Sequence, residues 1–181
     1  FSEVFGPLPI DGVEIDATVV EAGRRFMDLN LPNLQITIMD GRQYLAATPK
    51  RYDVVLLDAY NPPYIPFHLT TREFFNGIKQ ILKPNGKLIV NYIGVIHGPQ
   101  SRGYHAMAAT ISDVFADTRV LFVYGEKFTD QQNILFFASM TSQDDLQLAR
   151  APRTGNVLTD DLNPIDIFFE EASRGEVIYQ R

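Results

Sequence analysis

Three successive hydrophobic segments of the chain end in carboxylates, and these acids are the residues best suited to carry chemistry. "GVEID" contains Glu14 and Asp16, "LQITIMDG" ends in Asp40 and Gly41, and "YDVVLLD" ends in Asp58. The carboxyl ends of parallel strands meet at one edge of a sheet, and ligands of α/β proteins bind at that edge. We therefore expect these residues at a common acidic edge, able to accept hydroxyl groups or to hold a cation.

Each acid also has a structural interpretation that the sequence leaves open. Asp16 and Asp40 precede helix-like segments, where Asp is a favoured N-cap. Glu14 lies in a strand, where Glu is unfavourable without a partner, and an acid ending the second strand of such a fold can accept both hydroxyls of a ribose. Asp58 ends the most apolar strand. We expect it to be partly desolvated and to act as a proton acceptor or cation partner, the alternative being an anchor for the following loop.

The segment after Asp58, "AYNPPYIPFHL", combines three prolines with several aromatic side chains. Proline fixes φ and restricts the residue before it, so this loop should be stiff. Its position directly after a strand-end acid favours a pocket wall or gate, although a rigid connector is the alternative. The loop residues that we expect to bind or gate a substrate are Tyr60, Asn61, Tyr64 and His68.

Composition excludes several classes of protein. The 181 residues carry a net charge of −6, which argues against a nucleic-acid partner held by phosphate contacts. There is no cysteine and the three histidines lack ligand spacing, so we expect no metal. No apolar run is long enough to span a bilayer and no signal peptide is evident, so we expect a cytoplasmic protein with no membrane partner. We expect one domain over 1–181, with an irregular C-terminal tail over 151–181.

Hydrophobic periodicity predicts alternating strands and helices. The expected strands are 12–16, 34–40, 52–58, 87–93, 119–125 and 132–140. The expected helices are 17–29, 41–48, 69–83, 101–117 and 142–150. In helix 17–29 we expect Val19, Val20, Phe26 and Met27 on the inner side, and in helix 69–83 a capping box of Thr70 and Glu73.

This order predicts an α/β fold of the Rossmann-like, doubly wound type, with a mostly parallel sheet. Strand 52–58 is apolar enough to be covered on both faces. No helix separates the last two strands, so we expect them to form an antiparallel pair at one edge of the sheet.

The motifs "GVEIDATVVEAGRRF", "IMDGRQYL", "YDVVLLDAYNP", "LTTREFFNGIKQILKPNGKLIVN" and "LTDDLNP" resemble, in this order, the polyamine aminopropyltransferases. These are the spermidine and spermine synthases, which share the fold of S-adenosylmethionine-dependent methyltransferases. The resemblance implies that Glu14 binds the ribose of the cofactor nucleoside, and that Asp40 and Gly41 contact the adenine. We also expect Asp16 among the cofactor-binding residues. It implies that Asp58 is the catalytic or amine-orienting carboxylate, and it is compatible with a homodimer.

Two features depart from the family pattern. The family has a strand and a glycine-rich loop before "VEID", and the single Gly6 is no substitute for that loop. After the third strand, synthases usually carry Asp-Ser-x-Asp-Pro with two acids, whereas this chain reads Asp58-Ala59-Tyr60-Asn61-Pro62. Asn61 can still hydrogen-bond an amine but carries no charge.

Three functions follow from this sequence. The leading hypothesis is a spermidine synthase-like transferase that moves an aminopropyl group from decarboxylated S-adenosylmethionine to a small amine such as putrescine. A methyltransferase that uses S-adenosylmethionine itself is the second. The third is a non-catalytic nucleoside-binding module.

Overall fold

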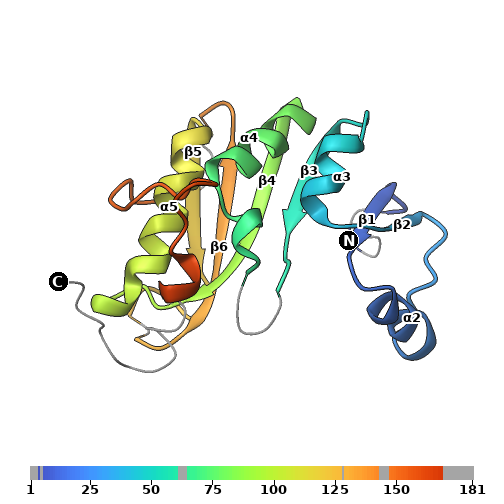
Figure 1. Ribbon diagram of the computed structural model, residues 1–181, viewed down its shortest axis with the longest axis horizontal. Coiled ribbons are helices and arrows are strands. Elements are labelled where there is room, and N and C mark those ends of the chain that lie inside the picture. Colours follow the sequence, from blue (N-terminus) through green and yellow to red (C-terminus); the bar gives the residue numbers. More distant parts are fainter. Residues whose placement is uncertain (1–3, 5, 61–64, 128, 143–146, 169–181) are drawn as a thin grey trace. The chain divides into compact units, whose positions relative to one another are not determined.

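The computed structural model describes residues 4, 6–60, 65–127, 129–142 and 147–168. The chain forms two compact units, the first ending at Thr48 and the second beginning at Pro49 (Figure 1). Each unit has its own hydrogen-bonded sheet.

The first unit is a β-α-β-α arrangement. Its elements are β1 (Ile10–Glu14), α2 (Ala17–Phe26), β2 (Leu34–Ile38) and α3 (Gly41–Ala47). The two strands pair in parallel, and the register places Glu14 opposite Ile38. No strand precedes β1 in the described part of this unit. The predicted elements are confirmed, with strand ends shifted by about two residues, as is usual for sequence-based boundaries.

The predicted inner side of the first helix is largely wrong. Of the four apolar residues expected there only Val20 is buried, while Phe26 and Met27 are 74% and 82% exposed. Helix α2 ends at Phe26, and Met27 is its C-cap with a non-helical backbone. Phe26 is the last residue of the helix and Met27 lies beyond it, so no further turn continues the apolar stripe that a helix through residue 29 would have had.

The second unit carries a five-stranded mixed sheet. Its strands are β3 (Tyr52–Leu57), β4 (Leu82–Gly94), β5 (Asp117–Phe122), β6 (Gln132–Ser139) and β7 (Ala149–Arg150). The strand order is β3-β4-β6-β5-β7. The helices of this unit are α4 (Arg72–Ile81) and α5 (Arg102–Val114), with 3-10 turns η1 (Phe67–Leu69) and η2 (Pro99–Ser101).

The prediction of a mostly parallel sheet is wrong for this unit. Only β3 and β4 pair in parallel, whereas the β4-β6, β6-β5 and β5-β7 pairs of the described strands are antiparallel. The expected antiparallel pairing of the last two predicted strands is confirmed, but β6 is not at the edge. The chain turns back after β5 without a crossover helix, and β6 lies between β4 and β5.

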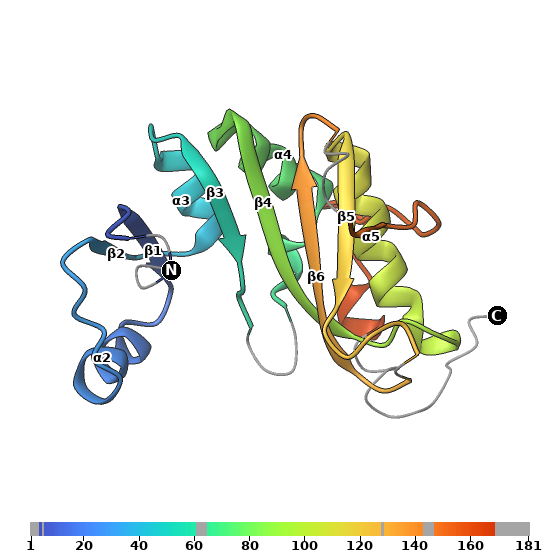
Figure 2. The same cartoon turned by 180° about the vertical axis from the view of Figure 1, so that it is seen from behind.

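One face of this sheet carries the hydrophobic core. Helices α4 and α5 both cover that face (Figure 1), and the sheet is seen in front of them from the opposite side (Figure 2). Alternation along β4 buries every second residue against the helices. The fully buried side chains of this core are Phe75, Ile78, Leu88, Val90, Met107, Ile111, Ile134 and Phe136.

Within the second unit, α4 and α5 lie on the same face of the sheet, so a doubly wound arrangement with helices on both faces stays a prediction. Val54 and Leu56 of β3 are 40% and 55% exposed, so the second unit by itself does not cover both faces of this strand. Leu121 of β5 is also 40% exposed on the same face. The sequence of β3 is thus more apolar than the environment that this unit provides for it.

Residues 151–168 are integral to the second unit. Leu158 and Ile165 are fully buried, and the backbone N–H of Leu158 donates to the hydroxyl of Thr110 on α5. The segment is mostly irregular, as predicted, with one helical turn at 165–168. The helix predicted for 142–150 is wrong at its end, where Ala149 and Arg150 form β7, and residues 143–146 lie outside the described part.

Helix α4 begins one residue later than the predicted capping box requires. Thr71 is the N-cap, and its hydroxyl accepts from the backbone N–H of Phe74. Thr70 instead donates to the carbonyl of Phe67 and accepts from the amide of Asn163. Glu73 accepts from the backbone N–H of Asp160. Thr70 and Glu73 therefore do not form a capping box, and each hydrogen-bonds a neighbouring segment of the chain instead.

Replacing Thr71 by alanine should lower the free energy of unfolding by about 1 kcal/mol, the usual cost of losing an N-cap hydroxyl. Thr71→Ser keeps the capping oxygen and should stay close to wild type. Urea unfolding followed by circular dichroism measures both. Equal stability of the alanine and serine variants would show that the cap contributes nothing.

Candidate active site

The first unit brings its predicted acids to one edge. Parallel pairing sets the end of β1 beside the end of β2, and the backbone N–H of Met39 donates to the carbonyl of Glu14 at 2.9 Å. Asp40 and Gly41 follow directly, and Asp16 lies two residues beyond Glu14. The sequence prediction of an acidic carboxyl edge therefore holds for this unit.

Asp16 and Asp40 cap helices with their carboxylates, whereas Glu14 does not. Its Oε1 accepts from the backbone N–H of Asp16 at 2.9 Å, which fixes the side chain against the turn after β1. Oε2 has no hydrogen-bond partner within the described residues. One oxygen thus orients the carboxylate and the other remains able to accept a hydroxyl.

Asp16 and Asp40 both act as helix N-caps. Asp16 accepts from Thr18 N–H at 2.7 Å, and Asp40 accepts from the N–H groups of Arg42 and Gln43 at the start of α3. Hydrogen bonding to Thr18 lowers the pKa of the Asp16 carboxyl below its usual value. The sequence left open whether Asp16 and Asp40 cap helices, and the structure shows that both do.

In the second unit, Asp58 follows β3 and is held by the neighbouring strand. The side-chain amide of Asn91 on β4 donates from Nδ2 to Asp58 Oδ1 at 2.9 Å. The strand register explains this contact, because Leu57 pairs with Val90 and the next residues of both strands are Asp58 and Asn91. Asp58 is exposed rather than partly desolvated, which corrects the expectation drawn from its apolar strand.

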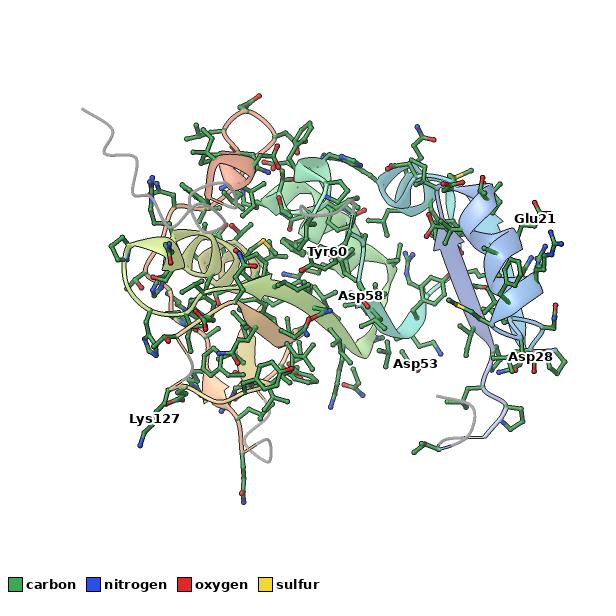
Figure 3. The ribbon with its side chains drawn as sticks, turned by 90° about the horizontal axis from the view of Figure 1, so that it is seen from below. Glu21, Asp28, Asp53, Asp58, Tyr60 and Lys127 are labelled. Carbon is green, nitrogen blue, oxygen red and sulfur yellow. The ribbon has the colours of Figure 1, made fainter. Side chains whose placement is uncertain are left out.

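Tyr60 anchors the start of the loop to β4. Its hydroxyl accepts from the backbone N–H of Ile93 at 2.6 Å and donates to the carbonyl of Asn91 at 3.2 Å. The pairing of β3 with β4 ends at Val90, so Tyr60 takes up edge groups of β4 that β3 no longer reaches. Burial raises the pKa of Tyr60 well above its usual value, so the hydroxyl stays protonated near neutral pH. Figure 3 shows Tyr60 and Asp58 close together, after the end of β3, the strand that carries Asp53.

The remaining predicted loop residues are only partly accounted for. His68 is half-buried in η1, with its ring edge-on to that of Phe67. Asn61 and Tyr64 lie outside the described residues. Asn163, from the "LTDDLNP" motif, donates from its side chain to the carbonyl of Phe67 and fastens the segment after the loop.

Sequence reasoning missed Asn91 as a site residue. The available signal was its polarity within the apolar run "KLIVNYI", since a lone amide in a buried strand usually has a specific partner. The described residues contain no cluster of three or more His, Asp or Glu side chains that could hold a metal ion. They also contain no helix long and apolar enough to cross a membrane.

Parallel strands that end in carboxylates, within an α/β fold, are typical of Rossmann-like architecture. The human methyltransferase-like protein 13, solved with S-adenosylhomocysteine, has this fold: it superposes with a TM-score of 0.61 over 95% of this chain and 74% of its own, at 21% identity. The chain belongs to the spermine/spermidine synthase domain family, which residues 8–146 match.

Two further relatives agree with this assignment. A probable polyamine aminopropyl transferase of Bifidobacterium longum (strain NCC 2705) is 33% identical over 119 residues, covering 66% of this chain and 26% of the relative. A probable spermidine synthase from Corynebacterium glutamicum ATCC 13032 superposes with a TM-score of 0.68 at 26% identity, covering 78% of this chain and 51% of that structure. The chain thus matches only a quarter to a half of the length of these two proteins.

Proposed function

We propose that this chain carries the aminopropyl-transfer site of a spermidine synthase-like enzyme. The reaction moves an aminopropyl group from decarboxylated S-adenosylmethionine to a small amine such as putrescine. The observation that carries the proposal is Asp58, a carboxylate at the carboxyl end of β3 that Asn91 orients by a 2.9 Å hydrogen bond. Membership of the spermine/spermidine synthase domain family supports the same reaction class.

The chemistry needs one carboxylate beside the attacking nitrogen. An alkyl amine has a pKa near 10.4, so at neutral pH it arrives as an ammonium ion and must lose a proton before it can attack. The nitrogen then forms a bond to the carbon next to the sulfonium, the carbon–sulfur bond breaks, and its electron pair stays on sulfur in methylthioadenosine. Asp58 holds the ammonium as its counter-ion and accepts the proton.

The nucleoside is assigned to the first unit. Glu14 accepts a ribose hydroxyl through Oε2, since Oε1 is engaged by the N–H of Asp16. Asp16 supports this arrangement by capping α2 and by bracing Glu14. Asp40 and Gly41, at the start of α3, contact the adenine.

Replacing Glu14 by alanine should weaken binding of methylthioadenosine roughly 10- to 100-fold, as expected for losing a hydrogen bond to a charged group. Isothermal titration calorimetry measures the affinity. Glu21→Ala is the matched control, because Glu21 is an exposed glutamate on α2 and should leave binding unchanged (Figure 3). Equal affinity of the Glu14 variant and wild type would remove the ribose role from Glu14.

Aminopropyl transfer uses decarboxylated S-adenosylmethionine, whereas methyl transfer uses S-adenosylmethionine itself. This difference in co-substrate tests the proposed function. Calorimetry with decarboxylated S-adenosylmethionine and with S-adenosylmethionine should show tighter binding of the decarboxylated form. The carboxylate of S-adenosylmethionine is disfavoured near acidic side chains, and the chain has a net charge of −6. Tighter binding of S-adenosylmethionine would instead support a methyltransferase, and binding of neither would contradict both.

A further inference from the structure

The second unit contains a cavity of about 250 Å³, lined by α5, by the segment 154–156 and by the helical turn at 165–168, which lies beside α5 (Figure 1). Its polar lining consists of Arg102, His105, Thr154 and Asn156, and its described lining residues include no acid. Arg102 therefore gives the cavity a positive charge, although the whole chain carries a net charge of −6. The volume is below the roughly 300–1,000 Å³ of sites for drug-sized ligands, so the cavity suits a small molecule or ion.

The segment that forms one wall of this cavity is held on both sides of residues 154–156. The backbone N–H of Ala151 donates to a carbonyl of β5 at 2.9 Å, and that of Leu158 donates to the Thr110 hydroxyl on α5 at 2.9 Å. Between these two anchors, a Cβ added to Gly155 would lie 2.5 Å from the carbonyl oxygen of His105. Glycine is thus what allows the segment to approach α5 so closely, and the wall is in place before any ligand binds.

The two nitrogen-bearing rings and planes of the cavity are also oriented by their neighbours. The Arg102 guanidinium lies over the ring of the buried Phe168, 4.5 Å from its centroid. This contact uses the face of the guanidinium, whereas its five N–H donors lie in its plane. The Thr154 hydroxyl lies 3.4 Å from Nδ1 of His105. With this hydroxyl donating to Nδ1, the neutral imidazole carries its proton on Nε2 and offers a second donor.

We propose that this cavity is a binding site for a small oxyanion, either a phosphate or a carboxylate. Arg102 supplies the positive charge and a planar set of donors that matches the oxygen atoms of both groups. His105 and Asn156 add neutral N–H donors, and hydrogen bonds to an anion are stronger than those between neutral groups. The inference does not rest on the proposed function, because no residue of this cavity belongs to the candidate active site.

The test uses inorganic phosphate and acetate as probes, titrated into the whole chain at constant ionic strength so that screening does not change. The ring resonances of His105 in NMR spectra, assigned by their absence in His105→Gln, should shift saturably with at least one anion at concentrations up to about 10 mM. The resonances of His68 and His97, which do not line the cavity, should not follow them.

The two probes distinguish the two ligand classes. A response to phosphate alone assigns the site to a phosphate group, and a response to acetate alone assigns it to a carboxylate. A response to both supports a site for either oxyanion. The absence of a saturable response to both probes overturns the inference.

Replacing Arg102 by glutamine removes the charge and should weaken anion binding roughly 10- to 100-fold, as expected for a lost bond between charged groups. Asn156→Ala is a second variant in case the first impairs folding, since Asn156 is exposed, and it should weaken binding at least about fivefold. Arg153→Gln is the matched control, because Arg153 is an exposed arginine that donates to the carbonyl of Ala116 and does not line the cavity.

The control should bind the anion like wild type. Unchanged affinity in both Arg102→Gln and Asn156→Ala, or an equal loss in Arg153→Gln, would overturn the site, because the effect would then be one of overall charge. Anion binding by a protein without aminopropyl transfer would leave this inference standing. Transfer by a protein that binds neither probe would overturn this inference alone.

Discussion

Replacing Asp58 by asparagine should lower kcat for aminopropyl transfer roughly 100- to 10,000-fold, the usual contribution of a positioned general base. Asparagine keeps the shape of the side chain and removes both the proton acceptor and the counter-charge for the ammonium. The affinity for putrescine should fall with it, whereas binding of methylthioadenosine should be unaffected. Initial rates of methylthioadenosine formation, measured at saturating co-substrate, provide the comparison.

Asp53→Asn is the matched control for this experiment. Asp53 lies on β3, the strand that precedes Asp58, is exposed, and pairs with Lys83 at 2.7 Å. An exposed pair of this kind contributes about 1 kcal/mol or less to stability, so the variant should fold and turn over like wild type. If Asp58→Asn kept a rate within threefold of wild type, Asp58 would not be the base.

Replacing Arg119 by alanine should lower the free energy of unfolding by about 3–5 kcal/mol. Arg119 donates from Nε to Asp117 at 2.8 Å, and the two residues are only 9% and 4% exposed. The truncation removes the guanidinium that donates to the buried Asp117 carboxylate, and removing one member of a buried ion pair is costly. Urea unfolding of the second unit within the whole chain measures the loss.

Two comparisons make this prediction specific. Lys83→Ala breaks the exposed pair with Asp53 and should cost no more than about 1 kcal/mol. The double variant Asp117→Ala with Arg119→Ala should cost less than the sum of the two single variants, because neither charge is then left alone. An Arg119→Ala variant that lost less than 1 kcal/mol would show that the pair is not needed for stability.

Most helices and strands could be predicted from the sequence because their hydrophobic periods are regular. The apolar stripe of α4, ending with Ile78 and Ile81, and the alternation along β4 are both set by burial against one core. The carboxyl-edge positions of Glu14 and Asp58 followed from the same reasoning, since they depend only on where β1 and β3 end.

The errors arise where long-range pairing overrides local pattern. Nothing within residues 132–139 shows that β6 inserts between β4 and β5, because strand order depends on contacts between distant segments. An apolar strand such as β3 likewise suggests cover on both faces, while Leu56 remains 55% exposed in its unit. The segment 149–150 forms a strand only because β5 offers it an edge.

In the candidate site, too, the residues set by local sequence could be predicted, and those set by pairing of distant segments could not. The acids were found from their positions in the sequence, but the partner of Asp58 was not, because Asn91 follows 33 residues later and meets it only through the register of two strands. Tyr60 was expected to bind a substrate or to gate a pocket, and its hydroxyl bonds to the backbone of β4. A substrate-binding or gating role stays a prediction for Tyr60 and for the other residues of the loop.

The central claim, that this chain catalyses aminopropyl transfer at Asp58, is tested most directly by product formation. The purified protein is incubated with decarboxylated S-adenosylmethionine and putrescine, and methylthioadenosine and spermidine are quantified by chromatography, with Asp58→Asn in parallel. Both products should form in equal amounts with wild type and fall at least about 100-fold with the variant. The absence of methylthioadenosine from the wild-type reaction with any polyamine, or equal product from both proteins, would contradict it.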